Sequence, residues 1–210
     1  MSEARLRAAA ALRALNHAFV GRDADADVLA RITSWAVDAA ARLQTGAVRD
    51  RAALLPGHLG RMFGLDPVEA DQDAANPMAD RAVGGPGNPL SADLDVDYGQ
   101  DGVVVRTTLG AAYEGAPGRA HGGMVAALFD DITGFLLPLA GTPAYTGQLT
   151  VRYARPVPIG EVLEFRAAIE RHHGRKLHVT AQCRAGDETV ATAEVLFITV
   201  ERSRFGHSAR

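Results

Sequence analysis

The sequence predicts an α+β fold in which an antiparallel sheet of six strands wraps around one central helix, preceded by a helical extension. The apolar residues before residue 46 recur at helical spacing, which predicts the extension. Two short β-like runs after Leu90, and a series of alternating apolar and polar stretches after residue 144, predict the sheet. One long helical pattern separates them. We therefore expect a helical extension over 1–46, a connector over 47–90 and the main domain over 91–202.

Two helices are expected in the extension. Residues 3–20 are rich in alanine, the residue with the highest helix propensity, and their leucines recur at spacings near three and four. Asp25 or Asp27 can cap a second helix, whose apolar stripe continues until Gly46 offers a stop. An apolar stripe requires a surface that covers it. We therefore expect these helices to cover or extend a pocket of the main domain.

The segment 47–90 predicts an irregular connector. It is rich in proline and glycine. Proline lacks a backbone N–H and fixes its φ angle, so helices and central strands rarely contain it.

The expected strands fall into two groups. Residues 93–98 and 102–109 form a pair joined by Gly99-Gln100-Asp101-Gly102, a hairpin signal because glycine tolerates positive φ. After residue 144, apolar and polar residues alternate, which is typical of strands with one buried face. The last stretch, 190–200, is more continuously apolar and predicts a more fully buried strand.

The central helix is expected over about 121–139. At about 100° per residue, one arc of about 140° is apolar and faces the core. Its members are Met124, Val125, Leu128, Phe129, Ile132, Phe135, Leu136 and Leu139. The opposite face carries Asp130 among the small residues Ala126 and Thr133, which lets another backbone approach, and Asp131 lies at the edge of the apolar arc. Two strands, one buried helix and four strands make the layout of the hotdog fold.

The run Gly118-Arg119-Ala120-His121-Gly122-Gly123 leads into this helix. The first N–H groups of a helix lack intrahelical partners and can bind an anion or a polarised carbonyl oxygen. Asp130 lies about two turns further along, roughly 10 Å away, so one substrate carbonyl cannot reach both groups of one chain. A dimer that pairs two such helices antiparallel would bring Asp130 of one chain beside Gly122 of the other.

Four motifs in register over residues 94–200 resemble PaaI-like hotdog thioesterases, including the mitochondrial long-chain acyl-CoA type. The run Glu114 to Gly123 followed by Asp130 resembles their signature, and Thr146 falls where they have a hydroxyl residue beside the carboxylate. The other two motifs are Tyr153-Ala154-Arg155-Pro156-Val157-Pro158 and Gly174-Arg175-Lys176. The chain departs from several relatives at Gly115, where they have asparagine.

The resemblance implies an enzyme that hydrolyses acyl-CoA, works as a homodimer or a dimer of dimers, and uses no cofactor. Asp130 would be the general base or the nucleophile, and the Gly122 N–H would polarise the thioester carbonyl. Thr146 would position the carboxylate or the water. His121 is another candidate for the catalytic site, although a role in capping the helix fits it better than a role as a base.

Further candidates for substrate binding are Gly123, Glu114, Arg152, Arg155, Arg175 and Lys176. CoA carries phosphates, and arginine contacts phosphate in a bidentate manner. The four cations fit solvated strand ends equally well. His172 and His173 are not accompanied by a pattern of metal ligands, so no metal site is expected.

Composition narrows the class of protein further. A net charge of -3 does not favour nucleic acid as a partner. Cys183 is the single cysteine, which favours a reducing compartment, and no apolar run approaches the ~20 residues of a membrane span. We therefore expect a cytoplasmic protein. Two alternatives to hydrolysis stay open: a hotdog hydratase or dehydratase that uses His121, and a noncatalytic acyl-CoA-binding module.

Overall fold

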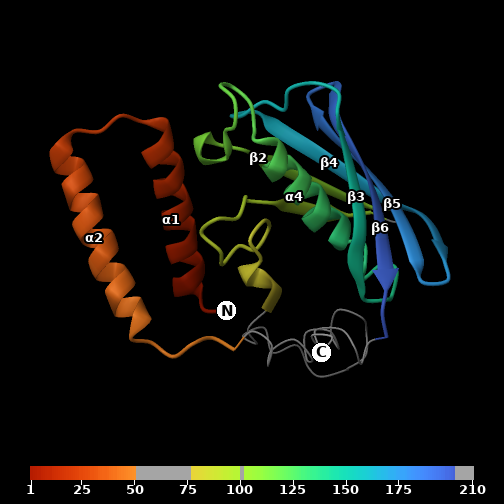
Figure 1. The fold of residues 1–210 in the computed structure, drawn as a ribbon, viewed down its shortest axis with the longest axis horizontal. Helices are drawn as coiled ribbons and strands as arrows, with labels where there is room; N and C mark the ends of the chain where they lie inside the picture. Colours follow the sequence, from red (N-terminus) through yellow and green to blue (C-terminus); the bar gives the residue numbers. More distant parts are fainter. Residues whose placement is uncertain (51–76, 100–101, 202–210) are drawn as a thin grey trace.

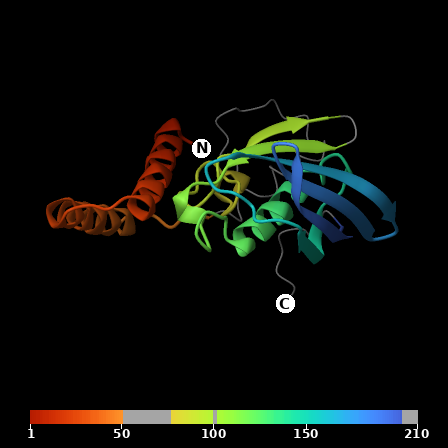
Figure 2. The same ribbon diagram turned by 90° about the horizontal axis from the view of Figure 1, so that it is seen from above.

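The computed structural model describes residues 1–50, 77–99 and 102–201. A pair of helices, α1 (Glu3–Gly21) and α2 (Ala26–Gln44), lies beside a domain made of one sheet and the helix α4 (Gly122–Gly134) (Figure 1). Seen from above, the helical pair projects sideways from the sheet domain (Figure 2). The expected helical extension and sheet domain are therefore both present.

The sheet has six antiparallel strands in the order β1-β2-β4-β5-β6-β3. Gly174 and Gly186 make the tight turns from β4 to β5 and from β5 to β6, each with a φ of 56°. β3 lies at one edge, so one side of its backbone has no neighbouring strand among the described residues. The strands are β1 (Asp95–Tyr98), β2 (Val103–Thr108), β3 (Ala144–Tyr153), β4 (Val162–His173), β5 (Lys176–Ala185) and β6 (Glu188–Thr199).

The hydrophobic core lies between α4 and the concave face of the sheet. Val125, Leu128, Phe129 and Ile132 of α4 have no exposed surface. The Phe129 ring packs edge-on against Phe165 of β4, with 5.2 Å between the ring centroids. A six-stranded antiparallel sheet around a buried helix is the hotdog fold, as expected from the order of the elements.

α4 is shorter than expected, because it ends at Gly134 and the chain continues through hydrogen-bonded turns. Pro138 explains the early end, since proline cannot continue the hydrogen-bonding pattern of a helix. The assignment of Leu139 to the core was wrong: its exposed fraction is 49%. The assignment of Thr133 to the open face was also wrong, because its side chain is fully buried and its hydroxyl donates to the carbonyl of Phe129.

α1 is attached to the sheet domain through polar contacts. The buried Arg13 guanidinium donates to the carbonyls of Pro86 and Asn88, and it forms an ion pair with Asp93 at 2.7 Å. His17 Nδ1 accepts from the backbone N–H of Ala112. These contacts place α1 beside the segment that leads toward α4.

α2, in contrast to α1, is not anchored to the sheet domain by buried contacts. Its N-cap is Asp25, whose carboxylate accepts from the N–H of Val28 at 2.8 Å, so the first of the two expected capping residues is used. However, α2 contains no buried residue. The expectation that both helices cover or extend a pocket of the main domain was therefore wrong for α2.

The connector expected over 47–90 lies largely outside the described residues, as do Gln100 and Asp101 of the hairpin turn. The described part contains a short 3-10 helix, η2 (Pro77–Asp80), followed by turns. Among the described residues, no helix combines the length and the apolarity that crossing a bilayer requires.

Candidate active site

α4 runs antiparallel beside the edge strand β3, and a hydrogen bond joins the two at each end of α4. Near the start of the helix, the Tyr153 hydroxyl donates to the carbonyl of Gly122 at 2.5 Å. Further along, the Thr146 hydroxyl donates to Asp130 Oδ1 at 2.7 Å. The two ends of β3 thus hold the two groups that were predicted to carry the chemistry.

The start of α4 presents an unused donor. His121 is the N-cap, and its Nδ1 accepts from the N–H of Gly123 at 3.0 Å. Among the described residues, no acceptor faces the N–H of Gly122, as is usual for the first N–H groups of a helix. The positive end of the helix dipole strengthens the attraction of this N–H group for negative charge. An oxygen with developing negative charge can therefore bind at Gly122.

Tyr153 holds this first turn in place, a contact that the sequence analysis did not foresee. Burial raises the pKa of the Tyr153 phenol above its ordinary value, so the hydroxyl keeps its proton and remains a donor at neutral pH. A Cβ added at Gly122 would lie 3.5 Å from the Tyr153 hydroxyl oxygen. A larger side chain at residue 122 would therefore fill the space next to the free N–H.

Asp130 is exposed within the single chain and keeps the free oxygen Oδ2 for chemistry. A carboxylate that is held by one hydroxyl and otherwise open can accept a proton from water or attack a carbonyl carbon. Asp130 lies eight positions after Gly122 in the helix, which corresponds to about 12 Å at ~1.5 Å per residue. The structure therefore does not bring the predicted donor and carboxylate together within one chain.

Asp131 projects about 100° around the helix from Asp130 and is mostly buried, with 13% of its side chain exposed. Desolvation by burial raises the pKa of this carboxyl. Arg81, 3.5 Å away, lowers the pKa, neighbouring Asp130 raises it, and the backbone N–H of Gly84 lowers it. The Arg81 guanidinium also lies over the Phe135 ring, 4.7 Å from its centroid. Asp131 thus connects α4 to the segment after η2.

Glu114 closes the loop before α4. Its carboxylate accepts from the N–H of Gly118 at 2.5 Å, and its backbone pairs with Ala120. A Cβ added at Gly115 would lie 2.9 Å from the Cα of His121, so this tight loop requires glycine there. The structure therefore gives Glu114 a role in loop geometry, and contact with a substrate stays a prediction.

The comparisons with known proteins agree with this geometry. Residues 117–198, which include α4 and most of the sheet, match the family model described as Thioesterase superfamily. Residues 117–198 form a domain of the thioesterase superfamily. The match begins just before the helix start and includes Gly122, Asp130 and Thr146.

Named relatives of this thioesterase domain include acyl-coenzyme A thioesterase THEM4 of Xenopus laevis, which is 35% identical over 91 residues, or 42% of this chain and 41% of that protein. Acyl-coenzyme A thioesterase THEM5 of Mus musculus is 31% identical over 85 residues, or 40% of this chain and 34% of that protein. The match thus spans less than half the length of these curated relatives.

One solved structure resembles nearly the whole chain, including the helical extension. The crystal structure of the thioesterase superfamily protein RHA08564 has a TM-score of 0.74 and 26% sequence identity. The likeness covers 94% of this chain and 96% of that chain. The combination of the helical pair and the hotdog domain therefore also occurs in a related protein.

The basic candidates of the thioesterase domain form two separate pairs, and all four side chains are exposed. Arg152 and Arg155 flank Tyr153 near the start of α4, and Arg155 forms an ion pair with Glu188 at 3.4 Å. Arg175 and Lys176 lie at the other end of β3, because Arg175 Nε donates to the carbonyl of Thr199, which pairs with Ala144. One pair therefore lies near the Gly122 end and the other near the Asp130 end.

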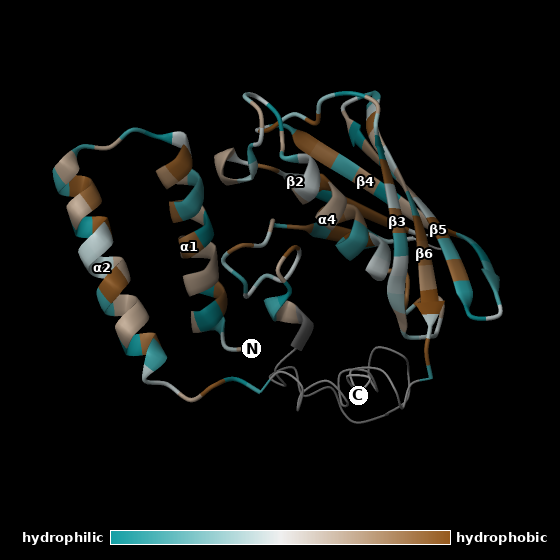
Figure 3. Ribbon diagram, in the orientation of Figure 1, coloured by the Kyte–Doolittle hydropathy of each residue, from teal (hydrophilic) through white to brown (hydrophobic). Residues whose placement is uncertain are grey.

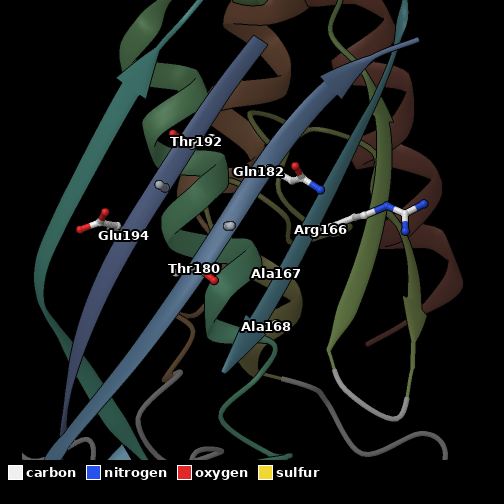
Figure 4. Close-up of a pocket in the computed structure, with 9 residues that line it drawn as sticks. Arg166, Ala167, Ala168, Thr180, Gln182, Thr192 and Glu194 are labelled. Carbon is white, nitrogen blue, oxygen red and sulfur yellow. The ribbon is translucent and has the colours of Figure 1, made fainter. Parts of the chain in front are cut away.

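The outer face of the sheet carries a shallow hollow of about 390 Å³. It lies on the side of the sheet away from α4 (Figure 4). Small residues form its floor, with Arg166 and Glu194 among the residues around it. Because the sheet separates this hollow from Asp130, it is not part of the candidate active site. Within the described residues, no cluster of His, Cys, Asp and Glu side chains is suited to hold a metal ion.

Proposed function

We propose that this protein hydrolyses acyl-CoA thioesters to a free acid and CoA. The observation that carries the proposal is the hydrogen bond from Thr146 to Asp130, which holds a carboxylate on the exposed side of α4 and leaves one of its oxygens free. The family match and the names of the relatives, acyl-coenzyme A thioesterases, support the choice of a thioester as substrate.

The proposed active site is shared between two copies. β3 is an edge strand whose outer backbone can pair with β3 of a second copy about a twofold axis. α4 runs antiparallel to β3, so this pairing also sets the two α4 helices antiparallel. The Asp130 end of one helix then meets the Gly122 end of the other. The distance that separates the two groups within one chain no longer matters.

In the proposed reaction, the thioester carbonyl oxygen accepts a hydrogen bond from the Gly122 N–H of one copy. Asp130 of the other copy either takes a proton from a water that attacks the carbonyl carbon or attacks that carbon itself. The carbonyl oxygen becomes negatively charged as the tetrahedral intermediate forms, and the N–H stabilises that charge. When the intermediate collapses, the carbon–sulfur bond breaks and the CoA thiolate leaves with the electron pair. In the water route the free acid is then formed, and the proton on Asp130 passes to the thiolate or to solvent; in the direct route an acyl anhydride remains on Asp130, and water hydrolyses it to the free acid and the carboxylate.

The shared arrangement also brings the two basic pairs together. Arg152 and Arg155 lie near the Gly122 end of one copy, and Arg175 and Lys176 lie near the Asp130 end of the other. All four side chains are exposed and can contact the phosphates of CoA, although Arg155 would first exchange its ion pair with Glu188 for a phosphate. Their placement supports a CoA ester over a thioester without phosphates.

The geometry of His121 disfavours the hydratase alternative. Because Nδ1 accepts from the N–H of Gly123, a neutral imidazole carries its proton on Nε2. Neither nitrogen is then free to accept a proton from a substrate. His121 is better suited to fix the first turn of α4.

The decisive experiment replaces Asp130 with asparagine and follows the release of free CoA with a thiol reagent. Asp130→Asn should lower turnover at least ~100-fold, as removal of a general base typically does. The control is Asp187→Asn, which removes an exposed carboxylate in the turn after β5. Full activity in Asp130→Asn would contradict the proposed mechanism. The wild-type protein is tested in the same way against the two alternatives. Loss of the absorbance of an enoyl-CoA substrate would indicate a hydratase, and binding of acyl-CoA without turnover would indicate a binding module.

The shared site has its own test. Asp130→Asn and Gly122→Val should each be inactive, the latter because the valine side chain fills the space beside Tyr153. Mixing the two variants forms heterodimers in which one of the two sites has both native groups, so activity should return. Mass measurements establish first that both variants fold and exchange subunits. Verified heterodimers without activity would rule out the shared site.

A further inference from the structure

The exposed apolar face of α2 is a feature that the proposed thioesterase mechanism does not use. At about 100° per residue, eight apolar residues fill one arc of about 140°. Leu29, Trp35 and Leu43 of this arc are 39%, 52% and 76% exposed. Apolar residues recur along the whole helix (Figure 3). The complete arc consists of Val28, Leu29, Ile32, Trp35, Ala36, Ala39, Ala40 and Leu43.

A helix of this length gains most of its stability from packing of its apolar face. α2 has little of that packing: it contains no buried residue, and within the arc Val28, Ile32 and Ala39 are only half-buried. In Figure 1 its ribbon runs on the far side of α1 from the sheet. Its polar side carries two arginines and two aspartates, so its net charge is zero. Helices that bind membrane surfaces usually carry an excess of Lys and Arg there. These features point to another protein surface.

The charges beside the arc are arranged symmetrically along the helix. The order is Asp27, Arg31, Asp38 and Arg42, and all four lie on the same flank. Within the helix, Arg42 Nε forms an ion pair with Asp38 at 2.9 Å, and both side chains remain largely exposed. In an antiparallel pair of identical helices, the same flanks of the two helices meet. If the twofold axis passes between residues 34 and 35, Asp27 faces Arg42 of the second copy and Arg31 faces Asp38 of the second copy. Both contacts between the helices then join opposite charges and extend the Asp38–Arg42 ion pair of each helix into a network.

The same register aligns the apolar residues. Val28 approaches Leu43 of the second copy, Ile32 approaches Ala39, and the two Trp35 side chains meet near the axis. The other flank carries Thr33 and Gln44, which are uncharged and therefore do not repel their symmetry mates. A twofold contact requires such a self-complementary surface, since the same patch serves both partners.

We propose that α2 is an association surface for a second copy of this chain, with two α2 helices packed antiparallel about a twofold axis near Trp35. This contact is separate from the pairing of β3 strands proposed above. The α2 contact either forms between the same two copies that pair through β3 or joins two β3-paired dimers into a tetramer. The inference goes beyond the proposed activity and does not depend on it.

Trp35 is the only tryptophan in the chain, so its fluorescence reports on this surface alone. In the full-length protein, its emission should shift to shorter wavelength as the protein concentration rises, in parallel with association in sedimentation experiments. Emission typical of an exposed indole at every concentration would overturn the proposal. A shift that appears only when neutral or anionic phospholipid vesicles are added would also overturn it and indicate a lipid partner.

A charge-exchange experiment tests the register. Arg31→Glu and Asp38→Lys each place like charges across the contact, so each variant alone should associate through α2 at least about tenfold more weakly. An equimolar mixture should recover the association and the Trp35 shift, because the introduced glutamate of one variant then faces the introduced lysine of the other. Circular dichroism verifies that both variants keep their helix content. If two well-folded variants do not recover on mixing, or are not weakened alone, the proposed pairing is wrong.

Discussion

α4 and α2 are both amphipathic helices, and their apolar arcs are equally wide, about 140° each, yet one is buried and the other is exposed. Val125, Leu128, Phe129 and Ile132 of α4 lie wholly inside the sheet. α2 buries no residue at all. The difference lies in the surroundings, since the sheet wraps around α4, whereas in the described part of the chain α1 is the one helix beside α2 (Figure 2).

The comparison shows that an apolar stripe predicts burial but does not identify the surface that provides it. For α4 the covering surface comes from the same chain. For α2 we infer that it comes from a second copy. The two helices should therefore respond differently to the loss of an apolar side chain.

The largest effect is expected for Phe129→Ala in α4. Phe129 is fully buried and packs against Phe165, so its removal leaves a cavity and should lower the free energy of unfolding by about 3–5 kcal/mol. Urea unfolding followed by circular dichroism measures the change. If this variant does not fold, Ile132→Val offers a milder test with an expected loss of about 0.5–1.5 kcal/mol. A neutral result for both would contradict the described core.

A smaller effect is expected where α4 meets β3. Thr146→Val removes the hydroxyl that donates to Asp130. Since a hydrogen bond to a charged group contributes about 1.5–3 kcal/mol and this one is exposed to water, turnover of acyl-CoA should fall about tenfold. Thr146→Ser should keep most of the activity, and Thr180→Val, at an exposed site of β5, is the matched control. Equal activity of Thr146→Val and wild type would remove Thr146 from the site.

A third prediction concerns the buried side of α4. The pKa of Asp131 is raised by burial, so the folded state binds its proton more tightly than the unfolded state does. The stability gained in this way is present below the unfolded pKa of about 4 and is lost as the pH rises through the folded pKa. Asp131→Asn removes this titration. The free energy of unfolding of wild type, measured relative to this variant, should therefore fall as the pH rises from about 3 to 7, and a rise would contradict the assignment.

The smallest effect on the stability of a single chain is expected for Trp35→Ala in α2. Trp35 is 52% exposed and contributes to no buried cluster, so unfolding of the hotdog domain in dilute solution should change by less than about 0.5 kcal/mol. Circular dichroism must follow this unfolding, because the variant has no tryptophan. The same substitution should weaken association at high concentration. A loss as large as that of Phe129→Ala would show that α2 is covered within its own chain.

The sequence alone determined the fold class, the order of its elements and the residues of the candidate site. These depend on local signals: the alternation along each strand, the glycines at the turns, and the short motifs around Gly122 and Asp130. The bond between Thr146 and Asp130 was also expected, through the resemblance to a family. The catalytic roles of these residues stay predictions until the variants above are measured.

Only the tertiary structure decided which distant segments meet. Arg81 pairs with Asp131, Tyr153 holds Gly122, and Arg13 binds the turn before β1, although 50, 31 and at least 73 residues separate the partners. No periodicity within one segment encodes such contacts, because they depend on how a sheet folds around a helix. The sequence did not predict the exposure of α2 for the same reason. An apolar stripe predicts that a helix face is shielded from water, but the surface that shields the face belongs to another segment and cannot be read from the stripe.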